Sequence, residues 1–434
     1  MTDTPTTHGI RRAAVLGAGS MGAGIAAQFA NAGVPVDLLD IPGPDADRDG
    51  PARAGLARVA AARAFTSEQV QALVTPGNTE DHLHRLRDAD WIVEAVIERL
   101  DIKRALFARV DGARKPGSVV SSNTSTLLRA DLVAGQSAAF AQDFVITHFF
   151  NPPWVMRLVE LVGGPETPPG HLDRVADAAR AVLGKVPVTC RDTPGFIANR
   201  IGCFWMAAAA LEAMRHGLTP QQADAVHGAL GIPRTGVFGL FDLIGIDLVP
   251  HVWGSLHRSL PGGDAFQRFD ITADALFRRL VAEGRHGRKT GAGFYRRAAD
   301  GTREMLDLAT GDYVPEGPAP ELPGQGDLAA LVADASPMGA YAAAVLGHVV
   351  AYAAEHAPAI AADVAAVDTA VELGYSWREG PFRLADRVGA GTLAAFLRAE
   401  GQGVPLLLSA AAGMGGFYRD GRALRSDGAR RTAR

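Results

Sequence analysis

The chain has 434 residues, with 43 Lys and Arg against 47 Asp and Glu, which gives a formal net charge of −4. A slightly acidic chain lacks the basic excess of nucleic-acid-binding proteins, so we expect no nucleic-acid partner. Hydrophobic residues make up 47% of the sequence, which excludes an intrinsically disordered chain. A chain of this length usually forms two or three domains.

The chain contains two cysteines, Cys190 and Cys203. Two isolated cysteines provide neither a disulfide framework nor the spacing of a metal site, so we expect no metal. They are typical of a protein in the reducing cytoplasm, which is the location we expect. The simplest interpretation is that both are small buried side chains.

Two segments bear on targeting. Residues 1–12 are polar and lack an apolar core followed by a cleavage site, so we expect no signal peptide. Residues 336–354 carry no Asp, Glu, Lys or Arg and are long enough to span a membrane. They contain a proline, two glycines and a histidine, however, and are rich in alanine. We therefore expect a buried helix there and no membrane span.

Residues 13–190 alternate between apolar runs that are typical of strands and periodic segments that are typical of helices. Alternating strands and helices predict a mostly parallel sheet covered on both faces. The predicted helices include 21–32 and 102–113. The predicted strands are 13–16, 36–39, 91–96, 118–121, 144–147, 158–162 and 186–190.

The pattern changes after Cys190. Asp192-Thr193-Pro194-Gly195 is a turn signal, and from Phe196 onward the chain is rich in alanine and leucine with helical periodicity. A stretch with four prolines and several glycines then resembles a linker. We expect a Rossmann-type α/β domain at 1–190, a helical domain at 191–300, a linker at 301–327 and a second helical module at 328–434.

The two helical modules are similar in sequence. Residues 236–245 (GVFGLFDLIG) align with residues 380–389 (GPFRLADRVG), and Gly-Phe-Tyr at 293–295 aligns with Gly-Phe-Tyr at 416–418. The two pairs are separated by different offsets, so the loops between them differ in length. This pattern predicts a duplication in the all-α part of the chain.

The segment from Gly17 to Gly22 matches G-x-G-x-x-G between a predicted strand and a predicted helix. In this motif the first glycine permits a tight turn and the second lets the backbone approach a pyrophosphate. The third lets the helix pack closely on the strand, and the helix N-terminus presents free N–H groups to the phosphates. A glycine-rich turn with no nucleotide is the plainer alternative. The candidate cofactor-binding residues here are Gly17, Gly19, Ser20, Met21 and Gly22.

Asp40 ends the next strand, 18 residues after Gly22. An acidic residue at this spacing is expected to accept hydrogen bonds from the adenosine ribose hydroxyls. Its charge would repel a 2′-phosphate, so NAD is favoured over NADP. FAD sites share the glycine pattern, and the pattern alone leaves FAD open.

His148 follows an apolar strand, and Glu160 lies within the apolar run Leu158–Val162. A glutamate in a buried strand is costly unless it is paired, and pairing with His148 would resolve that cost. The carboxylate would also orient the imidazole and raise its basicity, which suits a general base. A structural histidine with satisfied hydrogen bonds is the alternative.

Two further polar groups are candidates for contact with a substrate. Residues 121–125 (SSNTS) follow a predicted strand, and their hydroxyls could bind a substrate oxygen or only cap a turn. Asn199 lies on the first turns of a long predicted helix, where its amide could face a cleft or solvent.

Taken together, these motifs resemble the L-3-hydroxyacyl-CoA dehydrogenases of fatty-acid β-oxidation. The resemblance covers both the predicted Rossmann-type domain and the first helical module. The second module is similar to the repeat found where this dehydrogenase is part of larger β-oxidation proteins. The matching stretches are VLGAGSMGAGIA (15–26), VEAVIERLDIKRALF (93–107), SSNTS (121–125), HFFNPPWVMRLVELV (148–162), DTPGFIANR (192–200) and GRKTGAGFY (287–295).

The resemblance implies NAD-dependent oxidation of a (S)-3-hydroxyacyl-CoA. It implies that His148 is the catalytic base, that Glu160 orients it, and that Ser125 contacts the substrate oxygen. Asn151 and Asn199 would position substrate and nicotinamide. The remaining residues implied to lie near the cofactor are Glu98, Lys103 and Lys289.

The resemblance also implies an acyl-CoA substrate, a possible enoyl-CoA hydratase or thiolase partner, and a homodimer or a pseudo-dimer built from the duplicated helical modules. One segment departs from the family pattern. Residues 40–63 are longer and less regular than in compact family members, so contacts to CoA from this region cannot be transferred.

Three other functions are compatible with parts of this sequence. A β-hydroxyacid dehydrogenase that acts on CoA-free substrates would carry a catalytic lysine four residues before the helix asparagine, where this chain has Gly195. A catalytically silent NAD-binding protein would not need the Ser125, His148, Glu160 and Asn199 set. A scaffold for a hydratase or thiolase is compatible with dehydrogenase activity.

Overall fold

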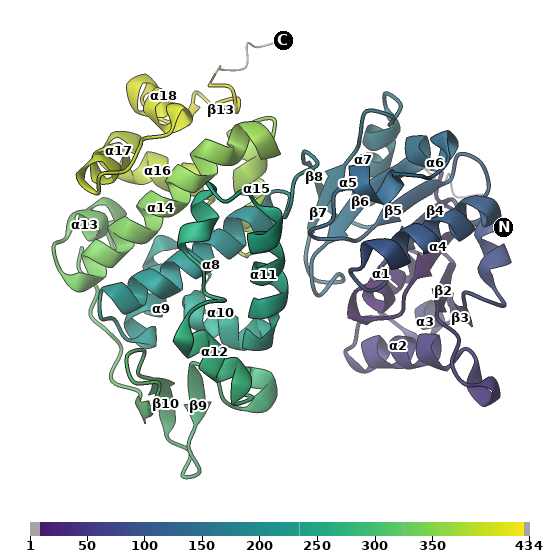
Figure 1. Cartoon of the computed structure of the whole chain (residues 1–434), viewed down its shortest axis with the longest axis horizontal. Helices are drawn as coiled ribbons and strands as arrows, with labels where there is room; N and C mark the ends of the chain where they lie inside the picture. Colours follow the sequence, from purple (N-terminus) through teal and green to yellow (C-terminus); the bar gives the residue numbers. More distant parts are fainter. Residues whose placement is uncertain (1–8, 234, 325, 429–434) are drawn as a thin grey trace. The chain divides into compact units, whose positions relative to one another are not determined.

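The computed structural model describes residues 9–233, 235–324 and 326–428. The chain divides into two compact units, with the boundary after Phe196 (Figure 1). The predicted domain boundary at residue 190 therefore precedes the end of the N-terminal unit by one short turn.

The N-terminal unit is built on an eight-stranded sheet in the order β3-β2-β1-β4-β5-β6-β7-β8. All neighbouring strands are parallel except β6 and β7, which are antiparallel. The first six strands have the order that is typical of dinucleotide-binding folds. The strands are β1 (Ala13–Leu16), β2 (Val36–Asp40), β3 (Val74–Asn78), β4 (Trp91–Glu94), β5 (Val119–Ser122), β6 (Phe144–Phe149), β7 (Leu158–Val162) and β8 (Val186–Thr189).

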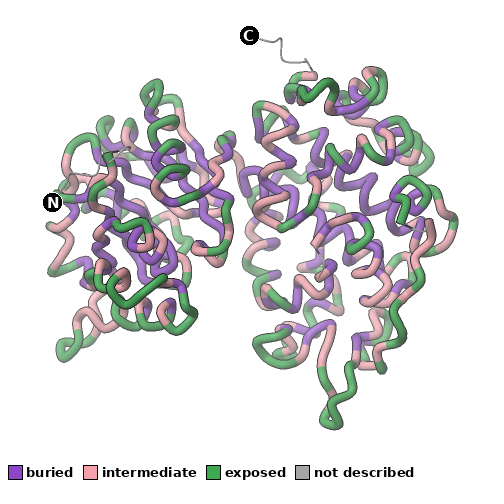
Figure 2. Tube along the Cα trace, turned by 180° about the vertical axis from the view of Figure 1, so that it is seen from behind, coloured by how far each residue is buried: buried purple, intermediate pink, exposed green. Residues whose placement is uncertain are grey.

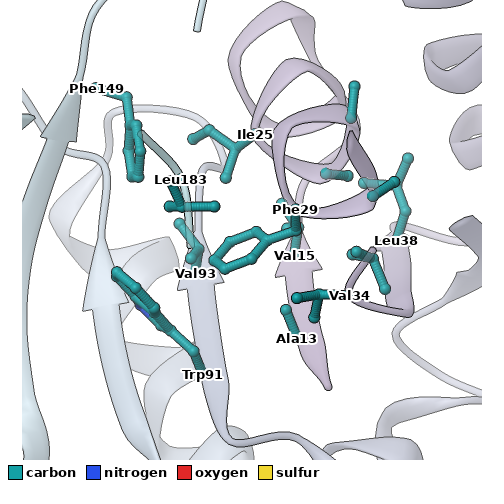
Figure 3. Packing of buried hydrophobic residues seen from close by; sticks show 14 of the residues in the cluster. Ala13, Val15, Ile25, Phe29, Val34, Leu38, Trp91, Val93, Phe149 and Leu183 are labelled. Atoms are coloured by element: carbon teal, nitrogen blue, oxygen red, sulfur yellow. The ribbon is translucent and has the colours of Figure 1, made fainter. Parts of the chain in front are cut away.

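The central strands of this sheet are buried on both faces, as Figure 2 shows, because helices cover them. Helix α1 packs Ile25 and Phe29 against β1 and β4, and the ring of Phe29 meets the ring of Trp91 edge-on at 5.4 Å between centroids (Figure 3). The helical segments are α1 (Ser20–Asn31), η1 (Asp45–Asp47), α2 (Gly50–Ala61), α3 (Glu68–Gln71), η2 (Leu83–Asp88), α4 (Leu100–Ala113), α5 (Arg129–Val133), α6 (Ala138–Asp143) and α7 (His171–Ala181).

The expected parallel sheet is confirmed, but strand β3 was not predicted from the sequence. Its residues, Val-Thr-Pro-Gly-Asn, include the two residue types least typical of strands. Proline is tolerated here because β3 lies at the edge of the sheet and pairs only with β2.

The C-terminal unit is mainly helical, and its longest helix, α14, packs against α8. Within the part of the chain that the structure describes, α14 is the one unbroken helix that is long and apolar enough to cross a membrane. Its most apolar window is 78% buried inside the protein, in agreement with the expected buried helix. The segments up to residue 306 are α8 (Ala198–Arg215), α9 (Pro220–Leu230), α10 (Gly236–Ile244), η3 (Ile246–Leu248), α11 (Val249–Ser259), η4 (Ala265–Arg268), α12 (Ala275–Ala282), η5 (Arg288–Thr290), β9 (Tyr295–Arg297) and β10 (Arg303–Leu306). The later segments are β11 (Tyr313–Pro315), α13 (Leu328–Ala333), α14 (Pro337–Ile360), α15 (Val364–Gly374), α16 (Pro381–Val388), α17 (Ala390–Ala399), α18 (Leu406–Met414), β12 (Tyr418–Arg419) and β13 (Arg422–Ala423).

The segment 301–327, which we expected to be a linker, contains ordered strands. Strand β10 pairs with β9 on one side and with β11 on the other, in a small antiparallel sheet. The expectation was wrong for residues 303–315 because the prolines that suggested a linker lie at the end of the edge strand β11 and beyond it, where no ladder hydrogen bond is lost.

The expected duplication is visible in the hydrogen bonds of the C-terminal unit. In each copy an aspartate accepts hydrogen bonds from two successive backbone amides of the Gly-Phe-Tyr segment. The donors to Asp242 are residues 294 and 295, and the donors to Asp386 are residues 417 and 418, all at 2.7–2.8 Å. Because the same contacts join the same elements twice, α9-α10-β9 and α15-α16-β12 are two copies of one module.

A second aspartate repeats in the same way. Asp224 of α9 and Asp368 of α15 each accept hydrogen bonds from two amides at the start of the following helix. Each also accepts a hydrogen bond from the tyrosine hydroxyl of the Gly-Phe-Tyr segment, Tyr295 in one copy and Tyr418 in the other. Residues 236–245 and 380–389 align at an offset of 144 residues, and these contacts show that this offset reflects real structural equivalence in this part of the module.

Candidate functional site

The glycine loop follows β1, and two of its glycines are required by the packing. Gly17 has a φ of +97°, and a Cβ there would lie 2.6 Å from the carbonyl oxygen of Ala95. A Cβ on Gly22 would lie 1.8 Å from the carbonyl oxygen of Gly17. Gly19, in contrast, has open space around it, with nothing within 4 Å of its missing side chain. The loop therefore leaves room at Gly19 for a group that approaches the backbone closely.

Helix α1 begins directly after this loop without a side-chain cap. Gly19 is the N-cap residue, and Ser20 and Met21 form the first turn. An uncapped N-terminus presents N–H groups and the positive end of the helix dipole, which together favour a phosphate. The donor set and the open space at Gly19 fit the pyrophosphate of a dinucleotide.

Asp40 ends β2 and is tied to the same loop. One carboxylate oxygen accepts a hydrogen bond from the Ala18 amide at 2.7 Å, and the other accepts from the Ile41 amide at 2.7 Å. These bonds hold the half-buried carboxylate beside the glycine loop, in the position expected for contact with a ribose. The acid at this position suits NAD.

The irregular segment 40–63 contains helix α2, which packs on the glycine loop. A Cβ on Gly55 would lie 2.2 Å from the carbonyl oxygen of Ala18, so the two backbones touch. Arg58 donates a hydrogen bond from its guanidinium to the same carbonyl at 3.0 Å. This arginine places a positive charge close to the phosphate-binding loop, and its role was not predicted.

Lys103 was expected near the cofactor, but the structure places its ammonium group in a buried ionic cluster. The side chain is 1% exposed, and Nζ lies 2.6 Å from Glu94 Oε1 and 3.2 Å from Glu98 Oε2. Glu94, at the end of β4, also accepts a hydrogen bond from the Ser122 hydroxyl at 2.6 Å. Burial raises the pKa of Glu94, against the opposing effect of Lys103. Lys103 therefore holds the β4–α4 segment together, and Glu94, a lone acid in an apolar strand, was the signal that the sequence analysis missed.

Glu98 anchors the loop that carries Ser125. Its Oε1 accepts hydrogen bonds from the Thr124 hydroxyl and from the backbone amides of Ser125 at 3.0 Å and Thr126 at 3.2 Å. Burial opposes ionisation of Glu98, but Lys103 and these donors outweigh it and lower the pKa of the carboxyl group. Glu98 thus orders the loop around Ser125, a contact that the expectation of a cofactor ligand did not include.

His148 and Glu160 form the predicted pair. The two residues lie opposite each other in the antiparallel register of β6 and β7, with His148 Nδ1 2.8 Å from Glu160 Oε2. Glu160 is fully buried, and His148 is 6% exposed. Because the carboxylate accepts the Nδ1 proton, the neutral ring carries its lone pair on Nε2, where it can take a proton.

The surroundings of this pair restrict the imidazole further. The ring of His148 lies 4.5 Å from that of Phe150 and 5.7 Å from that of Phe196, measured between centroids. Cys190 Sγ lies 3.6 Å from the other oxygen of Glu160. Aromatic walls and a second contact on the carboxylate leave the histidine little freedom to rotate.

The other predicted residues are divided between the two units. Asn151 is exposed in the segment that follows β6 of the N-terminal unit. Asn199 lies on α8 of the C-terminal unit, where its Oδ1 accepts a hydrogen bond from the Tyr375 hydroxyl at 3.2 Å. Lys289 also lies in the C-terminal unit, and its Nζ pairs with Asp247 Oδ1 at 2.5 Å. The glycine loop, Asp40, Glu98, Ser125, His148 and Glu160 thus lie in the N-terminal unit, where contacts join the loop to Asp40, Ser125 to Glu98, and His148 to Glu160.

Comparison with known proteins places this geometry in a family. Residues 12–193 match the model for the NAD-binding domain of 3-hydroxyacyl-CoA dehydrogenase, and residues 195–297 match the model for its C-terminal domain. The chain belongs to the 3-hydroxyacyl-CoA dehydrogenase family. Members of this family are oxidoreductases, and the N-terminal unit is accordingly the one that binds NAD.

Individual relatives differ in how much of this chain they cover. A probable 3-hydroxyacyl-CoA dehydrogenase from Deinococcus radiodurans is 41% identical over 67% of this chain and 84% of its own length. One from Bacillus subtilis is 35% identical over 91% of this chain, which spans only 53% of that longer relative. The crystal structure of 3-hydroxybutyryl-CoA dehydrogenase from Escherichia coli has the same fold, with a TM-score of 0.69 at 22% identity, over 93% of this chain and 98% of its own.

Proposed function

We propose that the protein oxidises a (S)-3-hydroxyacyl-CoA to the 3-ketoacyl-CoA in fatty-acid β-oxidation, with His148 as general base. The observation that supports this proposal is the His148–Glu160 pair, in which a buried carboxylate holds Nδ1 at 2.8 Å and leaves Nε2 available. Bound NAD would accept the hydride from C3 of the substrate. The remaining chemistry is a proton transfer that the residues of this chain can perform.

Each residue has a defined part in that transfer. Nε2 of His148 takes the hydroxyl proton, and Glu160 stabilises the imidazolium that forms because the negative charge is already in contact with the ring. Ser125, on the loop anchored by Glu98, would donate a hydrogen bond to the substrate oxygen as it becomes a carbonyl. In the reverse direction the same imidazolium returns the proton.

The activity can be tested with the purified protein, acetoacetyl-CoA and NADH, following the absorbance of NADH. Replacing His148 with Gln should lower kcat by about 10²–10⁴-fold, the usual contribution of a general base. Glu160→Gln should lower kcat less, because the base is retained but loses its charged partner. His251→Gln is a matched control. His251 is exposed on α11 and lies far along the chain from both the glycine loop and the His148–Glu160 pair, so this variant should retain full activity.

The possible outcomes separate the candidate functions. Full activity of the His148→Gln variant would contradict the role of this residue. NAD binding without turnover of any 3-ketoacyl-CoA would support a silent NAD-binding protein instead. A higher rate with a CoA-free hydroxy acid would support a β-hydroxyacid dehydrogenase.

We also propose that the protein works with an enoyl-CoA hydratase or a thiolase. The chain spans about half of the Bacillus subtilis relative, so its relatives include proteins with room for a second activity. Co-purification of the tagged protein with either enzyme would support this partnership, and a protein that elutes alone at high concentration would contradict it.

A further inference from the structure

Tyr375, a residue of the second helical module, contacts the predicted substrate-positioning residue of the first. It lies at the C-terminal end of α15, and its hydroxyl donates a hydrogen bond to Asn199 Oδ1 at 3.2 Å. The same hydroxyl lies 3.5 Å from Cys203 Sγ, one turn further along α8. Because burial raises the pKa of Cys203 to about 12, the thiol is neutral and does not place a charge beside the amide.

The ring of Tyr375 is fixed in this position by close packing. A Cβ on Gly202 would lie 2.2 Å from two atoms of the tyrosine ring, so the ring lies directly against the backbone of α8. Two residues further on, Trp377 packs edge-on against Trp205 of α8 at 5.2 Å between centroids. The Arg378 amide then donates a hydrogen bond to the carbonyl of residue 231 at 2.7 Å. Three of the four residues of segment 375–378 therefore contact α8 or the C-terminal end of α9.

This contact determines how the Asn199 amide can be used. An asparagine side chain has one oxygen that accepts and one NH₂ group that donates two hydrogen bonds. Because the tyrosine hydroxyl donates to the oxygen, the amide is held in the orientation that leaves the NH₂ group for another acceptor. A ketone or alkoxide oxygen of the substrate is such an acceptor.

We propose that Tyr375 is a positioning residue that orients the side-chain amide of Asn199, so that its NH₂ group is available to bind a ligand oxygen. This inference rests on the proposed dehydrogenase function, for which the family resemblance implies that Asn199 helps to position the substrate. The first module has no equivalent residue to offer, since the position that corresponds to Tyr375 is Gly231, which ends α9 as Tyr375 ends α15. The second module thus supplies a side chain that holds an amide of α8, outside the second module.

The contact can be tested without measuring activity. The chain has five asparagines, of which Asn199 is the only one after residue 196. In protein labelled with ¹⁵N-asparagine, the Asn199→Ala variant identifies the side-chain NH₂ resonances of Asn199. Tyr375→Phe keeps the ring against Gly202 and removes only the hydroxyl, so it should shift this pair of resonances and leave the other four in place.

A matched control is available within the same module. Tyr418→Phe also removes one buried hydrogen bond from a tyrosine hydroxyl, the bond to Asp368, and should leave the Asn199 resonances unchanged. If Tyr375→Phe leaves them unchanged as well, the hydroxyl does not hold the amide and the proposal is overturned.

Kinetics then test whether the contact matters to the reaction. Tyr375→Phe should lower kcat with acetoacetyl-CoA by about 3- to 10-fold, the equivalent of one hydrogen bond, while the KM for NADH stays within about 2-fold. In the Asn199→Ala background the same change should have no further effect. If Tyr375→Phe lowers kcat by the same factor in the wild type and in the Asn199→Ala variant, the positioning role is overturned.

The two hypotheses fail in different ways. If the wild-type protein turns over no 3-ketoacyl-CoA, the proposed function fails, while the NMR experiment still decides whether Tyr375 orients Asn199. If the wild-type protein is active and the resonances of Asn199 do not respond to Tyr375→Phe, the proposed function stands and this inference fails.

Discussion

The two copies of the helical module share their internal contacts but differ at the positions that surround those contacts. Both copies keep one aspartate that accepts hydrogen bonds from the Gly-Phe-Tyr segment and another that accepts them from the start of the following helix. The differences lie at positions separated by the offset of 144. The first copy has Gly231, His227, Gly239 and Asp247 where the second has Tyr375, Val371, Arg383 and Gly391.

This difference indicates which contacts maintain the fold and which were free to change. The aspartates accept hydrogen bonds from backbone amides that would otherwise be buried without a partner, so both copies need them. The variable positions instead decide what each copy contacts. The first copy keeps the Asp247–Lys289 ion pair, and the second supplies Tyr375 to Asn199.

The largest effect is expected where the two copies are alike. Asp242→Ala and Asp386→Ala should each lower the free energy of unfolding by about 2–4 kcal/mol, because each leaves two backbone amides without an acceptor. Urea unfolding followed by tryptophan fluorescence would measure both. Glu355→Ala, at an exposed position on α14, is the control and should change stability by less than about 0.5 kcal/mol. A large loss for only one aspartate would show that the copies are not equivalent.

A smaller, pH-dependent effect is expected where the copies differ at His227 and Val371. Burial lowers the pKa of His227 from its ordinary 6.5 to about 3, so the folded protein keeps this ring neutral in mild acid. In the unfolded chain His227 binds a proton below about pH 6.5, whereas in the folded protein it stays neutral. The free energy of unfolding therefore decreases as the pH falls from about 6.5 toward 3. Between about pH 7 and pH 5 this linkage amounts to about 2 kcal/mol.

The test of that difference is the variant His227→Val, which gives the first copy the residue of the second. At neutral pH the variant should be less stable, because it loses the contact between His227 Nε2 and the Tyr341 hydroxyl at 2.9 Å and leaves a cavity. The difference in free energy of unfolding between the wild type and the variant should become smaller as the pH falls from 7 to 5. A series of urea unfolding curves would measure it. A gap that is constant over this range would contradict the assignment of the pH dependence to His227.

The smallest effect is expected at Arg383, which occupies the position of Gly239. Its guanidinium lies 3.3 Å from Glu372 and 4.4 Å over the ring of Tyr418, but the side chain is 46% exposed. Arg383→Ala should therefore cost less than about 1 kcal/mol, and the loss should shrink further at high salt. A loss as large as that of Asp386→Ala would mean that Arg383 belongs to the contacts that maintain the fold.

Much of the N-terminal unit could be predicted from local sequence patterns. The bounds of β1 and β7 agree with the predicted strands, and the glycine loop, Asp40 and the His148–Glu160 pair lie where the motif spacing indicated. The pairing of Glu160 with His148 could be predicted because a charge inside an apolar strand needs a partner, and few candidate partners lie nearby in the sequence. Strand β3 was missed because its proline and glycine argue against a strand unless the edge position is known.

The amino-acid sequence by itself determined most strands of the N-terminal sheet, the nucleotide loop and the repeat, because each follows from periodicity or from steric demands within a few neighbouring residues. Only the tertiary structure decided that Glu98 anchors the Ser125 loop, that Lys103 is buried between two carboxylates, and that Tyr375 reaches Asn199 across 176 residues of chain. Contacts of this kind depend on how whole elements pack, and packing depends on all the side chains at an interface at once. No spacing rule along the chain encodes it.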